Sequence, residues 1–305
     1  MSGGRRRRIL PRMVRFAFIA AFVAVLGSGS AFAQADAVAR GAYVFAAAGC
    51  AGCHTDVKNN GQLLAGGREL KTPFGSFFGP NITAHPEAGI GKWTDADFIR
   101  ALRHGRRPDG AHYFPVFPYT SFTKMTDRDM LDLKAYIFSL PVSAQPSKPN
   151  TLGFPFNVRF LQFGWKLLFF APGEFRADPA KSAEINRGAY LTQALGHCAE
   201  CHSPRDGFGG LRTDMLYGGD LNHAGQGTKV PNISPHRETG LGKWSEADYI
   251  ELLASGMTPE GDFVGGDMGE VVANSTSKLT PADRAAMIAY LRQIKPVEQR
   301  VRGGN

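Results

Sequence analysis

A five-residue pattern occurs twice in this chain and constrains its fold more than any other feature. The copies are CAGCH at 50–54 and CAECH at 198–202, and together they contain all four cysteines of the 305-residue sequence. The spacing C-x-x-C-H is that of a covalently attached c-type haem, in which two thiols add to the porphyrin and the histidine reaches the iron. We therefore expect two covalently bound haem c groups. Their attachment residues would be Cys50, Cys53, Cys198 and Cys201, with His54 and His202 as proximal iron ligands.

Three other interpretations use the same residue types. A thioredoxin-like redox pair requires C-x-x-C beside a β-α-β pattern, which the sequence does not show, and it gives no role to the following histidine. A structural zinc site uses cysteine and histidine, but here the two pairs lie far apart in the chain. Disulfides suit an exported protein, yet a two-residue gap suits them poorly. The haem interpretation is favoured because it uses every residue of the pattern.

The N-terminal residues resemble a secretory signal. A basic stretch that ends at Arg15 precedes the apolar run 16–26, and small residues lead to Ala31-Phe32-Ala33. This order is typical of a cleaved signal peptide over residues 1–33. A retained membrane anchor is the alternative, although the apolar run is shorter than the roughly 20 residues of a spanning helix. We expect a periplasmic protein that is exported by its signal peptide.

The net charge gives little indication of a nucleic-acid partner. The whole chain is formally +8, and the expected signal contains six arginines and no other charged residue, so its removal leaves +2. The mature sequence lacks a basic stripe with interleaved aromatic residues, which nucleic-acid binding would favour. We expect no nucleic-acid partner.

The sequence repeats itself beyond the haem pattern. Residues 40–43 and 187–190 both read RGAY, and PNITAHPEAGIGKW at 80–93 is matched by PNISPHRETGLGKW at 231–244. Helical periodicity dominates and no extended strand-like alternation appears. We expect an all-α fold of two tandem class I cytochrome c-like domains. The expected boundaries are 34–142 for the first domain, 143–182 for an aromatic-rich linker and 183–299 for the second domain.

Each half should contain the same helices. The motifs Thr94-x-x-Asp97 and Ser245-x-x-Asp248 predict capping boxes, and a last helix should begin after Thr126 and after Thr280. The linker concentrates apolar side chains at 160–170 and is too short to span a membrane. It can pack between the domains, or it can form a patch that docks on a partner subunit or a membrane surface.

An electron-transferring c-type haem commonly has methionine as its second axial ligand. In the second domain Met268 lies in a glycine-rich loop between two predicted helices, and it is the candidate distal ligand. Met257 and Met287 are competitors, but Met287 falls inside the last helix and should face the core. A methionine is by itself more often a core residue.

The first domain differs at the corresponding position. The repeat offset of 151 places Phe117 opposite Met268, and phenylalanine cannot bind iron. Met125, in the same loop, is one candidate for the distal ligand. His104 and His112, which have no counterparts in the second half, are others. An open distal position is the remaining possibility.

The chain also resembles the cytochrome c subunits of periplasmic bacterial dehydrogenases of the alcohol, gluconate and molybdenum hydroxylase types. The resemblance rests on the haem motifs, TPFG at 72–75, GIGKW at 89–93, RPDG at 107–110, PYTSF at 118–122 and MGEVV at 268–272. It implies the same cysteine and histidine roles, and Met268 as the second distal ligand. Many members have methionine where this chain has Phe117, and a third haem domain of the alcohol dehydrogenase type is absent.

The sequence favours an electron carrier over an enzyme. A diheme cytochrome of this kind would accept electrons from a periplasmic dehydrogenase subunit and pass them to a downstream acceptor of the respiratory chain, while the partner performs the substrate chemistry. No separate catalytic constellation is evident. The alternative, motivated by Phe117, is a diheme oxidoreductase acting on thiosulfate or peroxide at an open first haem. Peripheral membrane association is a further expectation.

Overall fold

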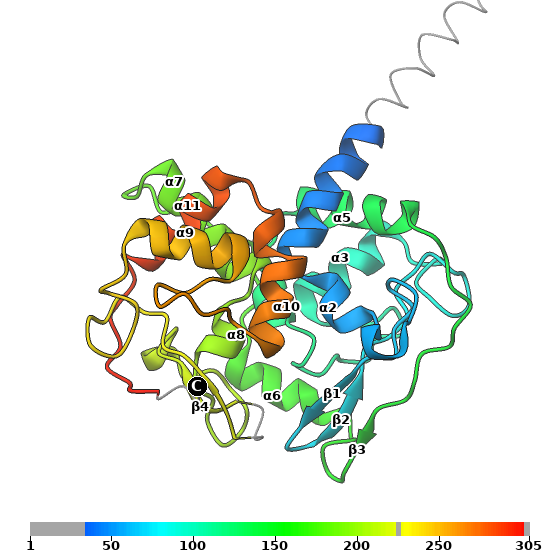
Figure 1. Cartoon of the computed structure of the whole chain (residues 1–305). Helices are drawn as coiled ribbons and strands as arrows, with labels where there is room; N and C mark the ends of the chain where they lie inside the picture. The colour runs from blue at the N-terminus through cyan, green and yellow to red at the C-terminus, as the bar shows by residue number, and fades with distance from the viewer. Residues whose placement is uncertain (1–33, 224–226, 302–305) are drawn as a thin grey trace, which may run out of the picture.

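Two helical halves lie side by side in the structure, a computed structural model that describes residues 34–223 and 227–301 (Figure 1). The expected signal peptide therefore lies outside the described residues. In the first half, a helix over residues 34–47 is followed by α2 (Cys50–His54), η1 (Val57–Asn59), α3 (Asp95–His104), α4 (Tyr119–Phe122) and α5 (Asp127–Ser139). The linker contains α6 (Leu161–Phe169).

The second half repeats this order with additional short turns. Its helices are α7 (Ala183–Tyr190), the π-helical turn η2 (Leu191–Leu195), α8 (Ala199–His202), η3 (Thr213–Met215), α9 (Glu246–Ser255), α10 (Gly266–Asn274), η4 (Thr276–Lys278) and α11 (Pro281–Leu291). Helices α10 and η4 occupy the stretch that in the first half holds α4. The two halves are therefore copies of one fold that differ most between the third and the last helix.

The expectation of an all-α fold needs a correction, because two small antiparallel sheets are present. One contains β1 (Glu69–Thr72), β2 (Gly75–Phe78) and β3 (Thr151–Leu152) in that order, and the other pairs β4 (Asp220–His223) with β5 (Thr228–Val230). Both hairpins lie between the haem motif and the capped helix. Their strands have four residues or fewer, too few for an alternating pattern to be recognised in the sequence.

Local signals in the sequence determine where the helices begin. Thr94 caps α3 and Ser245 caps α9, each in a complete capping box with an aspartate three residues later. Thr126 and Thr280 accept the capping hydrogen bond at the starts of α5 and α11, and Pro281 follows Thr280. These predicted starts are confirmed. They could be predicted because a cap depends only on residues three or four positions apart.

A glycine in each RGAY sequence lets two helices cross closely. A Cβ atom on Gly188 of α7 would lie 1.8 Å from the Ala286 carbonyl oxygen of α11, and one on Gly41 would lie 1.9 Å from the Asp132 carbonyl oxygen of α5. Either distance is far below van der Waals contact. The repeated glycine therefore fixes how the first and last helices of each half pack.

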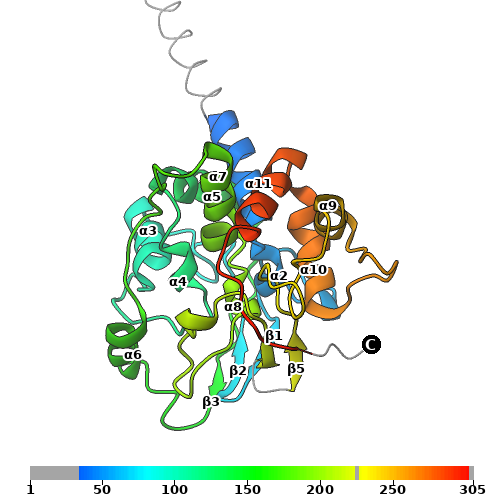
Figure 2. The same ribbon diagram turned by 90° about the vertical axis from the view of Figure 1, so that its left-hand side faces the viewer.

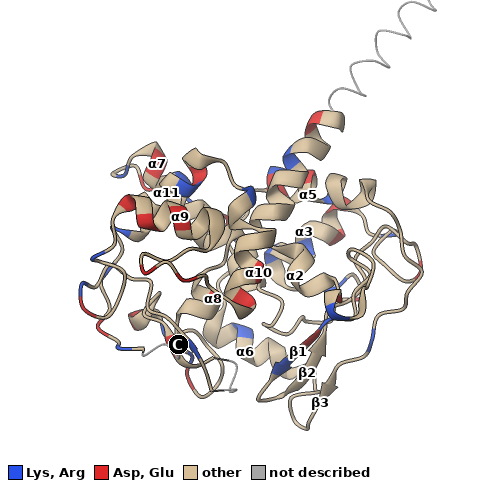
Figure 3. Cartoon of the chain, in the orientation of Figure 1, with Lys and Arg blue, Asp and Glu red and all other residues tan. Residues whose placement is uncertain are grey.

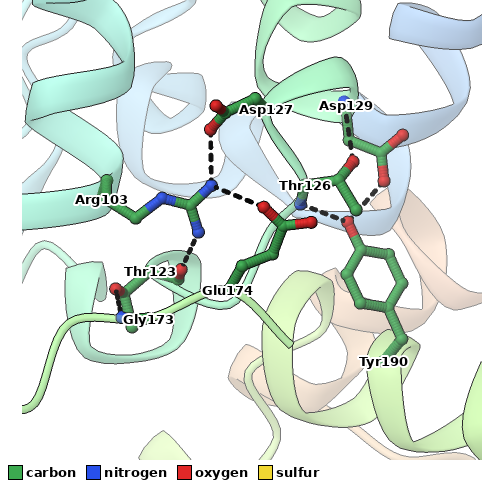
Figure 4. A network of polar contacts seen from close by, with 8 residues as sticks. All are labelled: Arg103, Thr123, Thr126, Asp127, Asp129, Gly173, Glu174 and Tyr190. Carbon is green, nitrogen blue, oxygen red and sulfur yellow. Dashed lines mark hydrogen bonds and ion pairs between the residues drawn. The ribbon is translucent and has the colours of Figure 1, made fainter. Parts of the chain in front are cut away.

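The interface between the halves has matching contacts in both directions. The hydroxyl of Tyr43 donates to Asp283 at 2.5 Å, and the hydroxyl of Tyr190 donates to Asp129. Each tyrosine also accepts the backbone N–H of the threonine that caps the helix bearing its aspartate. Figure 4 shows the Tyr190 contact beside Arg103, which pairs with Asp127. We call the two tyrosine–aspartate pairs the tyrosine clasps.

The linker is held by both halves. Strand β3 joins the first-half sheet, and the Phe175 N–H donates to the Lys124 carbonyl at 2.9 Å. On the other side, the Trp165 indole N–H donates to the Phe208 carbonyl of the second half at 2.9 Å. No helix among the described residues is long and apolar enough to cross a membrane.

Candidate haem-attachment sites

The four motif thiols are positioned by two short helices, α2 and α8. All four are free, with Cys50 and Cys198 half-buried and Cys53 and Cys201 exposed. Burial raises the pKa of Cys50 to about 12 and that of Cys198 to about 11. Each motif thus presents two protonated thiols on one helical turn, as thioether formation to a single porphyrin requires.

Both motif histidines are oriented by a backbone carbonyl. The Nδ1 atom of His54 lies 2.8 Å from the Pro80 oxygen, and Nδ1 of His202 lies 2.8 Å from the Pro231 oxygen. Burial lowers the pKa of both imidazoles, which favours their neutral form. A carbonyl can only accept, so Nδ1 carries the proton and Nε2 keeps its lone pair. That is the tautomer that a metal-binding imidazole needs.

A buried asparagine fixes each of these carbonyls. Asn81 follows Pro80, and its side-chain amide donates to the Ser143 and Gln145 carbonyls at 2.8 Å each. Asn232 follows Pro231 and donates in the same way to Val297 at 2.8 Å and to Gln299 at 3.2 Å. Sequence reasoning missed this role, although the repeated PNIT and PNIS sequences contain the signal.

The residues present fit a covalently bound haem. Each motif offers two free thiols and one neutral imidazole with Nε2 available, which are the donors that haem c attachment uses. A four-ligand zinc site would need further donors nearby. Within residues 34–223 and 227–301, no group of three or more His, Cys, Asp or Glu side chains converges in that way.

Each haem motif is covered by an element of the other half. Helix α10 packs against α2, as both ribbon views show (Figures 1 and 2). Arg68, just before β1, pairs with Glu270 of α10. Reciprocally, Thr120 of α4 donates to Glu200 inside the second motif at 2.6 Å, and Ser121 donates to it at 3.2 Å. The two motifs therefore lie on either side of one shared interface.

The residue before the first motif cysteine differs between the halves. Gly49 occupies it in the first half with φ of 62°, and His197 occupies it in the second with φ of 38°. A left-handed backbone is unusual for a residue other than glycine, although histidine is among the more tolerant. The His197 ring packs edge-on against Phe122 of the first half, with centroids 5.5 Å apart. His197 thus belongs to the interface between the motifs, a role that sequence reasoning missed.

The two predicted distal positions have different surroundings. Met268 lies half-buried in the first turn of α10, after two glycines. Phe117 is held in an aromatic cluster, with ring contacts to Tyr113, Tyr119 and Phe122. The Tyr113 N–H donates to the Gly105 carbonyl, and the Val264 N–H donates to the Gly256 carbonyl. These two bonds are equivalent at an offset of 151, so the alignment of the two halves holds close to Phe117 and Met268. Met268 as a ligand stays a prediction.

Met125 is fully buried, one residue before the Thr126 cap of α5. The offset is 154 here, so its counterpart is Leu279, a core residue before Thr280. Ligation by Met125 stays a prediction, and the Leu279 equivalence gives its side chain a packing role in either case.

The other candidate ligands lie elsewhere. His104 and His112 both lie near Lys166 of the linker helix. Met287 is buried in α11.

The fold and the motif geometry agree with known sequences. The cytochrome c family model matches residues 38–141 and again residues 185–295. The chain belongs to the cytochrome c family. Membership implies covalently bound haem c, and the two matches coincide with the two halves of the structure.

Several curated relatives are similar over most of this cytochrome. A diheme cytochrome c-type protein of Cereibacter sphaeroides is 44% identical, with 85% of this chain and 86% of that protein aligned. The fructose dehydrogenase cytochrome subunit of Gluconobacter japonicus is 37% identical across 87% of this chain and 54% of its own length. A nicotinate dehydrogenase subunit of Pseudomonas putida is 40% identical across 84% of this chain, but the match covers only 21% of that longer protein.

Proposed function

We propose that this cytochrome is an electron carrier that holds two covalently bound haem c groups and transfers electrons from a partner dehydrogenase to a downstream acceptor. The carrying observation is that the same site occurs twice, with free thiols and an imidazole whose Nδ1 is held by a proline carbonyl. When bound, haem supplies one-electron oxidation and reduction.

The protein's own contribution is to orient ligands and keep the two motifs in a fixed relation. Asn81 and Asn232 hold the carbonyls that set the tautomers of His54 and His202. The tyrosine clasps and the α10–α2 packing join the halves through partly buried contacts. A rigid frame of this kind suits electron transfer, because small displacements of the bound groups would change their coupling and potential.

The partner is inferred from the names of relatives. Cytochrome subunits of fructose dehydrogenase and gluconate 2-dehydrogenase are 37% and 34% identical to this chain over most of its length. A dehydrogenase subunit as electron donor is therefore the best-supported partner, and we propose a component of the respiratory chain as the acceptor. Residues 1–33 support export to the periplasm, where peripheral contact with the membrane would bring the carrier close to that acceptor.

A steady-state assay of the isolated, haem-loaded protein tests the carrier function. With thiosulfate plus ferricyanide as electron acceptor, or hydrogen peroxide plus an artificial one-electron donor, and no partner protein, we expect no sustained turnover. Prereduced protein should instead reduce a soluble oxidised cytochrome c of higher potential within one turnover. Sustained turnover of either small substrate, together with carbon monoxide binding by the reduced protein, would contradict the carrier function and favour an enzyme with an open first haem.

A further inference from the structure

The linker helix α6 presents apolar side chains to solvent. Phe160, Leu167 and Leu168 are 76%, 72% and 75% exposed, and Phe154 earlier in the linker is 83% exposed. Phe208 of the second half, 77% exposed, lies beside them because its carbonyl accepts the Trp165 indole N–H. We call these residues the linker face. In Figure 2, α6 lies at the outer edge of the molecule. Isolated exposed apolar residues are ordinary, but such a cluster indicates a binding surface.

The cations of the same segment point inward. Lys166 is buried and donates to the His104 and Gly105 carbonyls at 2.7 Å each. Arg159 donates to the His112 carbonyl at 3.1 Å and lies 4.6 Å from the Phe114 ring centroid. This is the reverse of an ordinary surface helix, which buries its apolar side. Figure 3 accordingly shows α6 as a mostly uncharged helix with one basic segment.

A cavity of about 430 Å³ opens beside the linker face. Its lining includes Arg106, His112 and Arg159 together with Phe160 and Phe163. The His112 Nδ1 atom is buried there without a hydrogen-bond partner. None of the residues described as lining it is acidic. The lining therefore offers two guanidinium groups and an imidazole, while Asp109, next to Gly110 in the chain, pairs with Arg107 at 3.1 Å and also attracts Arg159.

The second half lacks these basic side chains at the equivalent positions. The offset of 151 places Met257 opposite Arg106 and Phe263 opposite His112. The cationic residues are thus particular to the side of the molecule on which the linker face lies. This placement argues for one ligand that has both an anionic group and an apolar body.

We propose that the linker face binds the surface of an anionic phospholipid bilayer, with a lipid phosphate in the cavity between Arg106 and Arg159. The apolar side chains of α6 would enter the interfacial region around that headgroup. A phosphodiester matches guanidinium donors, and its acyl chains match the aromatic rim. This inference deepens the membrane contact proposed above and rests on it.

Co-sedimentation with lipid vesicles tests this site in the full-length, haem-loaded protein. We expect binding to phosphatidylcholine vesicles that contain phosphatidylglycerol and much weaker binding to pure phosphatidylcholine. Arg106→Gln should weaken binding about fivefold, because one basic residue near an anionic surface has an effect of that order. Leu167→Ser with Leu168→Ser should weaken it about tenfold or more. All three positions are exposed, so the fold should be retained.

Two exposed positions of the second half provide matched controls. Lys243→Gln removes one positive charge and Phe263→Ser removes one exposed apolar side chain, and both should bind like the unaltered protein. Equal binding to both vesicle types, or unchanged binding by the linker-face variants, would overturn the proposal. Self-association abolished by the two leucine substitutions, without vesicle binding, would assign the face to a protein contact instead. Electron transfer in solution is independent of these outcomes, so either proposal can fail alone.

Discussion

Asn232 makes the hydrogen bonds that keep the Pro231 carbonyl in place for His202. It is 2% exposed, donates to two carbonyls after α11, and accepts the Ser234 N–H at 2.9 Å. Removing such a side chain leaves several buried polar groups without partners, which costs more than the hydrogen bonds contribute in net terms. The imidazole orientation at the second site therefore depends on a residue that touches neither the histidine nor a thiol.

Replacing Asn232 with alanine should lower the free energy of unfolding by about 2–3 kcal/mol. Chemical denaturation followed by far-UV circular dichroism measures this loss. Asn222→Ala is the control, because Asn222 is exposed and accepts one backbone N–H, so its loss should be under about 1 kcal/mol. Equal losses in the two variants would show that the Asn232 hydrogen bonds stabilise the fold no more than those of an exposed asparagine.

Each tyrosine clasp joins the start of one last helix to the other half of the molecule. Asp283, in the first turn of α11, accepts from Tyr43 and from Arg187. Burial alone would raise the pKa of Asp283, but these hydrogen bonds outweigh burial and lower it overall. Because the pKa of Asp283 is lower in the folded protein, its carboxylate stabilises the fold at pH values above its unfolded-state pKa of about 4. This contribution is lost as the pH falls through that pKa and below it.

Asp283→Asn should therefore be less stable than the unaltered protein at pH 7, and the difference should shrink between about pH 5 and pH 3. Urea denaturation at a series of pH values gives the measurement. Asp206→Asn provides a control carboxylate that lies in a surface turn away from the clasp. If the loss of unfolding free energy in Asp283→Asn stays constant across this pH range, the pKa of Asp283 is not lowered by its clasp contacts.

The linker helix contains a buried lysine, Lys166, whose ammonium group donates to two carbonyl oxygens and lies over the Tyr119 ring without a carboxylate partner among the described residues. Burial, together with repulsion from Arg106, lowers the pKa of Lys166 to about 8. Between that value and the ordinary lysine pKa of about 10.4, the unfolded chain binds a proton that the folded chain has lost. Folding is therefore expected to become more favourable as the pH rises through this interval.

Lys166→Met should remove most of this rise in stability between pH 7.5 and pH 9.5. The denaturant midpoint at the two pH values measures the effect, and Lys243→Met, at an exposed lysine, should leave the rise unchanged. If the denaturant midpoints of Lys166→Met and of the unaltered protein rise equally between these pH values, the lysine ionises normally and its burial is not costly.

At the scale of the whole molecule, local signals were readable from the sequence and long-range ones were not. The haem motifs, the caps at Thr94 and Ser245 and the starts of the last helices follow from spacings of a few residues. The proline carbonyls were visible as a repeat, but their hydrogen bonds join residues 26 and 29 positions apart. The tyrosine clasps join residues of different halves, and nothing local to RGAY indicates which aspartate it meets.

The number of electrons that one chain accepts is the most direct test of the central claim. In a reductive titration of the exported, purified protein, followed by haem absorbance, the two equivalent sites predict two electrons per chain. Uptake of one electron, or of none, would contradict a carrier with two haem c groups.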